Sequence, residues 1–137
     1  IRYRGIGIAE RKWVFGSLWF DTRDGVTLIW SEELEYWVRV DPSTVGEYTG
    51  LKDKNGKEIY EGDVIRSPLS EDKTRPHRIF YHTGNAAFMR ALIDRKELCY
   101  LRLDQDWIYK FGKEVIGNIH DNPELIEKQT AERHKTN

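Results

Sequence analysis

The sequence is poor in cysteine, in long apolar runs and in net charge, and each shortage argues against a class of protein. Its one cysteine, Cys99, cannot form an internal disulfide and offers no CxxC zinc framework, which favours a reducing cytoplasm. No apolar run approaches the roughly 18 residues of a membrane helix, and no signal peptide precedes the first strand-like segment, so we expect neither membrane insertion nor secretion. A net charge of -1, from 22 basic and 23 acidic residues, lacks the excess that drives sequence-independent binding to nucleic acids.

Short runs of β-branched and aromatic residues recur along the chain, separated by turns that contain glycine, proline and charged residues. The expected strands are residues 1–8, 13–20, 26–30, 36–40, 64–66, 78–82, 86–93, 98–103 and 114–119. Asn55-Gly56 predicts a tight type I′ reversal, and Asn122 at an N-cap before Pro123 predicts a short C-terminal helix. The sequence therefore predicts one mainly β domain over residues 1–137: a single antiparallel, strongly twisted or barrel-like β body to residue 122, then a helix and tail.

The strand expected at residues 13–20 carries apolar side chains on both faces. Its odd positions include Trp13, Phe15 and Trp19, and its even positions are also mostly apolar. A small domain normally covers such a strand on one side, and the C-terminal helix has too few apolar residues to cover the other. A second copy in a symmetric homo-oligomer is therefore expected to bury the remaining face.

Two segments of the sequence carry a family resemblance. Residues 48–65 (YTGLKDKNGKEIYEGDVI) and residues 115–125 (VIGNIHDNPEL) closely resemble the central and C-terminal signatures of the YopX family of phage and prophage proteins. Residues 2–5 (RYRG) and 13–16 (WVFG) are also similar to family members. The resemblance implies a small, barrel-like β domain encoded in a bacteriophage or prophage genome. It implies no activity and no catalytic residue.

Two groups of carboxylates are candidate sites, one inside the central signature and one in an acidic stretch nearer the N-terminus. They are Asp53, Glu58, Glu61 and Asp63 in the first group, and Glu32, Glu33 and Glu35 in the second. The first group matches no calcium-loop spacing and has lysines beside it, so a solvated turn is favoured over a cation site. A pair of carboxylates from either group would be needed for a hydrolase.

The remaining chemical groups are scattered along the chain. The histidines are His77, His82, His120 and His134. The first two are five residues apart on an expected strand and so lie on opposite faces, and each of the four is interpreted as a surface or turn residue. Residues 5–8 (GIGI) imitate half of a dinucleotide fingerprint without the helix that should follow. We predict no catalytic residue, no metal ligand and no bound cofactor.

Aromatic residues are in surplus. The five tryptophans are Trp13, Trp19, Trp30, Trp37 and Trp107. Core packing or self-association is the favoured interpretation, and stacking of bases or sugars on a strand face is the alternative. The basic residues able to flank such a face are Arg75, Arg78, Arg90, Arg95, Lys96 and Arg102.

The sequence as a whole predicts a non-catalytic phage or prophage accessory protein that binds another macromolecule in the cytoplasm of a bacterial host. A protein partner is favoured over nucleic acid, and membrane association is not expected. The first alternative is a single-stranded nucleic-acid-binding β domain with Arg78, Arg90 or Arg102 on its rim. The second alternative is a carboxylate-dependent hydrolase.

Overall fold

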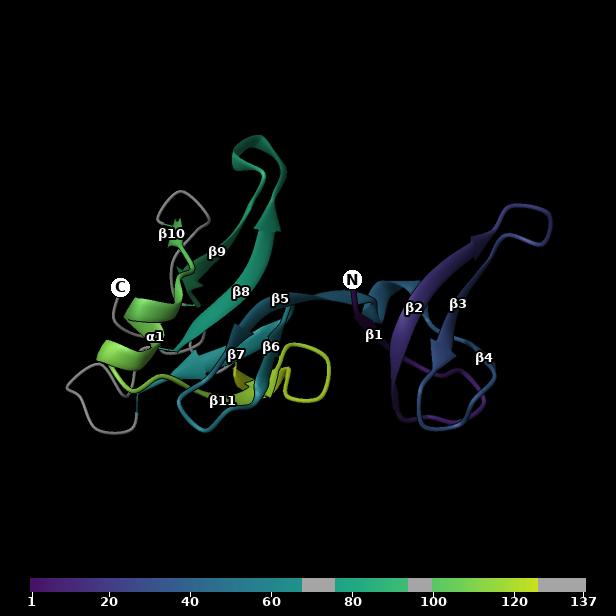
Figure 1. Ribbon diagram of the computed structural model, residues 1–137, viewed down its shortest axis with the longest axis horizontal. Helices are drawn as coiled ribbons and strands as arrows, with labels where there is room; N and C mark the ends of the chain where they lie inside the picture. Colours follow the sequence, from purple (N-terminus) through teal and green to yellow (C-terminus); the bar gives the residue numbers. More distant parts are fainter. Residues whose placement is uncertain (68–75, 94–99, 126–137) are drawn as a thin grey trace. The chain divides into compact units, whose positions relative to one another are not determined.

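The computed structural model describes residues 1–67, 76–93 and 100–125, among which strands predominate (Figure 1). Neighbouring strands run antiparallel, which confirms the mainly antiparallel β class predicted from the sequence. The chain divides into two compact units, residues 1–48 and residues 49–137. That these units belong to one domain stays a prediction from the sequence. Each unit buries a hydrophobic cluster of its own, which accounts for the division. In the described ranges, no helix is long and apolar enough to span a membrane.

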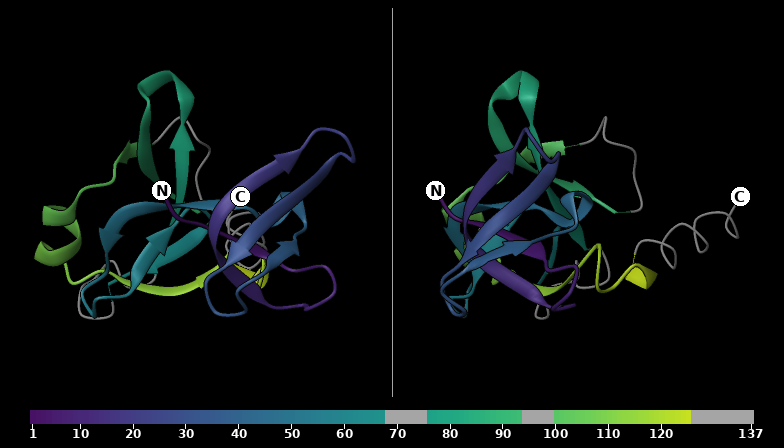
Figure 2. Two further views of the ribbon diagram at one scale, coloured as in Figure 1. Left: turned by 45° about the vertical axis from the view of Figure 1, so that its right-hand side comes forward. Right: turned by 90° about the vertical axis from the view of Figure 1, so that its right-hand side faces the viewer.

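The first unit is a twisted antiparallel meander (Figure 2). Its strands are β1 (Tyr3–Ile6), β2 (Trp13–Asp21), β3 (Val26–Ser31) and β4 (Trp37–Arg39). A 3-10 turn, η1 (Pro42–Thr44), then leads into β5 (Gly46–Lys52), which pairs with β1 at its start and continues into the second unit. A bridge between Gly7 and Val40 links the ends of β1 and β4, so the meander curls around its core.

One face of this meander forms the core of the first unit. The buried cluster consists of Val14, Ile29, Val38 and Val40, all at most 3% exposed. These side chains come from β2, β3, β4 and the residue after β4, and side chains alternate along a strand. The intervening residues of the same strands therefore point to the opposite face.

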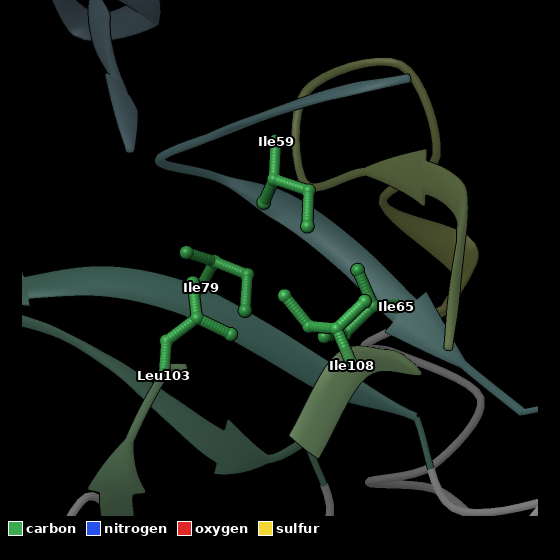
Figure 3. Close-up of a cluster of buried hydrophobic side chains, with 5 residues drawn as sticks. All are labelled: Ile59, Ile65, Ile79, Leu103 and Ile108. Carbon is green, nitrogen blue, oxygen red and sulfur yellow. The ribbon is translucent and has the colours of Figure 1, made fainter. Parts of the chain in front are cut away.

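The second unit contains a sheet with the strand order β10-β9-β8-β7-β11 among the described residues. The elements of the second unit are β6 (Glu58–Tyr60), β7 (Asp63–Arg66), β8 (His77–His82), η3 (Thr83–Asn85), β9 (Ala87–Leu92), β10 (Tyr100–Arg102), α1 (Gln105–Lys110) and β11 (Glu114–Asn118). Ile59, Ile65, Ile79 and Leu103 converge with Ile108 of α1 to form the core (Figure 3). The helix therefore covers one face of the sheet.

The sequence predicts a C-terminal helix from Pro123, and the structure starts it one residue later and caps it differently. Helical backbone starts at Glu124, and the residues beyond 125 lie outside the described part of the chain. The Oδ1 atom of Asn122 accepts the backbone N–H of Asn118 at 3.2 Å, so its side chain reaches back toward β11. The expectation of a simple Asn122 cap is therefore wrong, because the side chain closes the preceding turn instead.

Candidate functional site

An exposed apolar groove lies on the outer face of the first unit. Trp19, Leu28 and Trp37 line a cavity of about 260 Å³, which we call the tryptophan groove. Trp19 lies opposite Leu28 across the β2–β3 pair, so the two side chains share one face of the sheet. Trp37 of β4 lies opposite Trp30, and their rings meet edge to face at 5.6 Å. Trp19 is 59% exposed and Trp37 is 45% exposed, so the groove is open to solvent.

The other end of the same face is shielded by the chain itself. The guanidinium of Arg4 lies 4.5 Å from the ring centre of Trp13, and that of Arg2 lies 5.2 Å from the ring centre of Phe15. Both rings are half-buried. The apolar surface left for a partner is therefore narrower than the alternation of β2 predicts, and it lies toward Trp19.

A hydrogen bond stabilises the loop that precedes Trp37. The hydroxyl of Tyr36 donates to the Glu10 carboxylate at 3.3 Å. Desolvation and the neighbouring Glu10 charge both raise the pKa of Tyr36 above its usual value. The hydroxyl therefore keeps its proton and remains a donor across the physiological pH range.

Asp53, the first carboxylate of the central signature, is a structural residue. It is 2% exposed, and its Oδ1 atom accepts the backbone N–H groups of Asn55 at 2.8 Å and Lys57 at 2.9 Å. Its Oδ2 atom accepts the N–H of Val115 at 3.0 Å, from the other signature. The interpretation of this residue as part of a solvated turn is wrong, because the carboxylate is buried and joins two distant segments.

The C-terminal signature is a second structural turn, centred on Asn118. The Oδ1 atom of Asn118 accepts the N–H groups of His120 at 2.9 Å and Asp121 at 2.8 Å. The backbone N–H of Ile119 donates to the carbonyl of Gly62 in the central signature at 2.9 Å. The two signatures are therefore neighbours in the second unit, where their polar side chains close turns.

The sequence matches the model of the YopX protein family over residues 2–127. The chain belongs to the YopX family. This YopX chain is similar to the crystal structure of protein EF1440 from Enterococcus faecalis, with 27% identity and a TM-score of 0.60. That likeness covers 92% of the YopX chain and 98% of the other chain. No curated protein matches the sequence.

The other candidate carboxylates of the YopX chain lie apart or are engaged locally. Asp63 is 1% exposed and accepts the N–H of Tyr60 at 2.8 Å, whereas Glu58 and Glu61 are half-buried. In the acidic stretch, Glu32 pairs with Arg2 at 3.0 Å, Glu33 pairs with Lys12 at 3.8 Å, and Glu35 sits in a left-handed turn. Within the described ranges, no group of three or more histidine, cysteine, aspartate or glutamate residues is placed to hold a metal.

The histidines of the YopX chain do not converge. His77 and His82 lie on opposite faces of β8, as their spacing predicts. His77 is buried and meets the ring of Trp107 edge to face at 5.3 Å, so its interpretation as a surface residue is wrong. His120 is half-buried in the Asn118 turn, and His134 lies outside the described residues, as does Cys99.

A second aromatic surface lies on the sheet face of the YopX chain opposite α1. Strand register places five residues on this face, which we call the arginine–aromatic face: Arg78, Phe80, His82, Tyr100 and Arg102. The guanidinium of Arg90 lies on the other face, 3.8 Å from the ring centre of Trp107. The remaining predicted basic residues, Arg75, Arg95 and Lys96, fall outside the described part of the chain.

Proposed function

We propose that this YopX protein is a non-catalytic phage or prophage accessory protein of the bacterial cytoplasm, and that its tryptophan groove binds a segment of a partner protein. The observation that carries the proposal is the exposure of Trp19 and Trp37 beside an open cavity. Aromatic side chains at interface centres supply much of the binding energy of protein complexes. Folding alone does not require such rings at the surface.

The size of the groove favours side chains of a protein segment over a cofactor. Its volume of about 260 Å³ lies below the usual range of roughly 300–1,000 Å³ for small-molecule sites. It therefore has room for one or two apolar side chains. Residues 1–48 hold six basic and eight acidic side chains, which disfavours a phosphate backbone as the ligand.

The exposed area of the tryptophans favours a short segment over a second copy of the chain. Trp19, Trp30 and Trp37 are 59%, 39% and 45% exposed, which amounts to about 350 Å² if each ring offers about 250 Å². A stable interface buries about 800 Å² on each partner. A homo-oligomer stays a prediction from the sequence, and it would need further contacts outside this face.

The carboxylates give the hydrolase alternative little support. Asp53 and Asp63 are buried and accept backbone N–H groups, so these lone pairs are already used. Glu32 and Glu33 pair with basic side chains of the first unit. A general acid and base must instead reach a common substrate, so a binding role accounts better for these residues.

Truncating either groove tryptophan is expected to abolish capture of the partner. Tagged wild-type protein and the variants Trp19→Ala and Trp37→Ala would be used to recover proteins from prophage-induced cells. The recovered partner would then be titrated by interferometry. Loss of a central tryptophan costs about 2 kcal/mol or more, so affinity should fall at least about thirtyfold. Tyr109→Ala is the matched control, because Tyr109 is an aromatic residue of the second unit with 57% exposure.

Two results would contradict the role proposed for the groove. Equal binding of the partner by Trp19→Ala, Trp37→Ala and Tyr109→Ala would place the contact elsewhere. Light scattering that finds a wild-type dimer and a monomeric Trp19→Ala variant would show that the groove binds a second copy of the chain.

A further inference from the structure

We propose that the arginine–aromatic face of the second unit binds single-stranded nucleic acid. This site is separate from the tryptophan groove, and neither inference depends on the other. The opposite face of the same sheet packs against α1 through Ile108 and Trp107, so the arginine–aromatic face is the one that does not contact this helix. Met89 and Ala91 are buried on it, and the rings beside them are partly exposed.

Three rings of this face form one continuous cluster. The Tyr100 ring lies 4.8 Å from that of His82 at an interplanar angle of 31°, and 5.7 Å from that of Phe80. A hydrogen bond of 3.0 Å between the Tyr100 hydroxyl and Nε2 of His82 fixes this arrangement. The intervening strand β9 presents the small side chains of Ala87 and Ala91, which lets the rings approach each other across it.

The rings are only partly buried, as stacking requires. Phe80, His82 and Tyr100 are each of intermediate exposure, and Met89 lies buried on the same face. Bases of a single strand can turn outward and stack on such rings, whereas bases of a duplex are held in their own stack. The geometry therefore favours single strands.

The charge on this face matches a phosphate backbone. Arg78 and Arg102 border the rings, and Arg66 of β7 lies on the same face by strand alternation. The guanidinium of Arg78 lies over the Phe80 ring, 4.9 Å from its centre, which places a cation within the aromatic cluster. On the described strands of this face the carboxylate is Glu114, which pairs with Lys54 at 3.6 Å.

The local charge explains how such a site fits a nearly neutral chain. The net charge of -1 is the sum over both units, and residues 1–48 alone contribute two more acidic than basic side chains. An arginine border on one sheet is sufficient for phosphate contacts, because the interaction is screened beyond roughly 10 Å at ordinary salt.

Fluorescence anisotropy with labelled oligothymidylate and oligouridylate would test this site on the full-length chain. Wild type should bind both at low salt, and affinity should fall steeply from about 50 to about 200 mM salt. Tyr100→Leu should weaken binding about fivefold to a hundredfold, since one stacked base is lost. Tyr100→Phe loses the His82 hydrogen bond but keeps the ring, and it should bind like wild type.

A pair of charge variants distinguishes binding at this face from general electrostatic attraction to the whole chain. Arg102→Glu should weaken binding about tenfold and reduce the salt slope by about one. Arg39→Glu makes the same change in net charge on the exposed outer face of the first unit, and it should have little effect. No anisotropy change for wild type at low salt would overturn the proposal. Equal losses of affinity for Arg102→Glu and Arg39→Glu would also overturn it. A protein partner whose binding is lost in Arg102→Glu, with no oligonucleotide bound by wild type, would assign this face to a protein instead.

Discussion

Gly16→Ala is expected to destabilise the first unit strongly. Gly16 is buried in β2 with a φ of +154°, and a Cβ atom built on it would lie 1.7 Å from the carbonyl oxygen of Trp30. The obstacle is backbone in the paired strand β3, so relief requires the β2–β3 ladder to separate. We expect a loss of at least about 3 kcal/mol, which is a large part of the stability of a small domain.

Tryptophan fluorescence during thermal unfolding would measure this loss. Four of the five tryptophans lie in residues 1–48, so the signal reports mainly on the first unit. Its midpoint should fall by more than about 10 °C. Gly25→Ala is the matched control: Gly25 also has a positive φ, +68°, but nothing lies within 4 Å of a new Cβ, so the cost should be about 1 kcal/mol. A similar midpoint for both variants would show that the Trp30 carbonyl is not the obstacle.

Asp53→Ala is expected to destabilise the second unit by about 3–5 kcal/mol. The substitution removes the acceptor of three backbone N–H groups, those of Asn55, Lys57 and Val115. Hydrogen bonds to charged groups contribute about 1.5–3 kcal/mol each, and donors left buried without an acceptor add a desolvation cost. Asp53→Asn keeps one oxygen and should lose less, about 2 kcal/mol.

Urea unfolding followed by far-ultraviolet circular dichroism would compare these variants. Asp106→Ala is the control, because Asp106 is an exposed carboxylate in the first turn of α1 and should contribute about 0.5 kcal/mol or less. If Asp53→Ala and Asp106→Ala unfold at the same urea concentration, the buried carboxylate does not join the two signatures as described.

Strands rich in β-branched and aromatic residues could be predicted from the sequence, and those in segments rich in turn residues could not. β9 lies within its predicted run, and β2, β3 and β8 each extend only one residue beyond theirs, because β-branched and aromatic residues fill these segments. β5 and β6 flank the turn at Asn55-Gly56, in a segment so rich in glycine and charge that its strands are not apparent. The reversal itself is confirmed, but Gly56 has a positive φ and Asn55 does not, so the type I′ assignment is wrong. The Asp53 side chain determines the turn instead.

The helix α1 could not be predicted from the spacing of apolar residues. It has six residues, which is too short for a repeating apolar pattern, and its start depends on Asp104 accepting the N–H of Trp107 at 2.7 Å. The division into two units also escapes sequence reasoning, because no linker marks it. β5 crosses the boundary as one continuous strand.

The candidate site could be predicted in part. Apolar alternation along β2 indicates an uncovered face, and Trp19 lies on it. The alternation of β2 does not indicate Leu28, because its place beside Trp19 depends on the register of the β2–β3 hairpin. Once Asp21 is paired with Val26 across the turn, counting residues along both strands pairs Trp19 with Leu28.

The two signatures and the tryptophan groove consist of different residues, and this affects how the binding partner of the groove would change among related proteins. Residues 48–65 and 115–125 build turns of the second unit, whereas Trp19, Leu28 and Trp37 lie outside both segments. Substitutions in the groove do not remove the hydrogen bonds of Asp53 and Asn118. The binding specificity of the groove can therefore change while the fold stays the same. Under the binding role proposed above, two proteins with the same signatures can bind different partners, and inheritance of the signatures predicts a shared scaffold rather than a shared target.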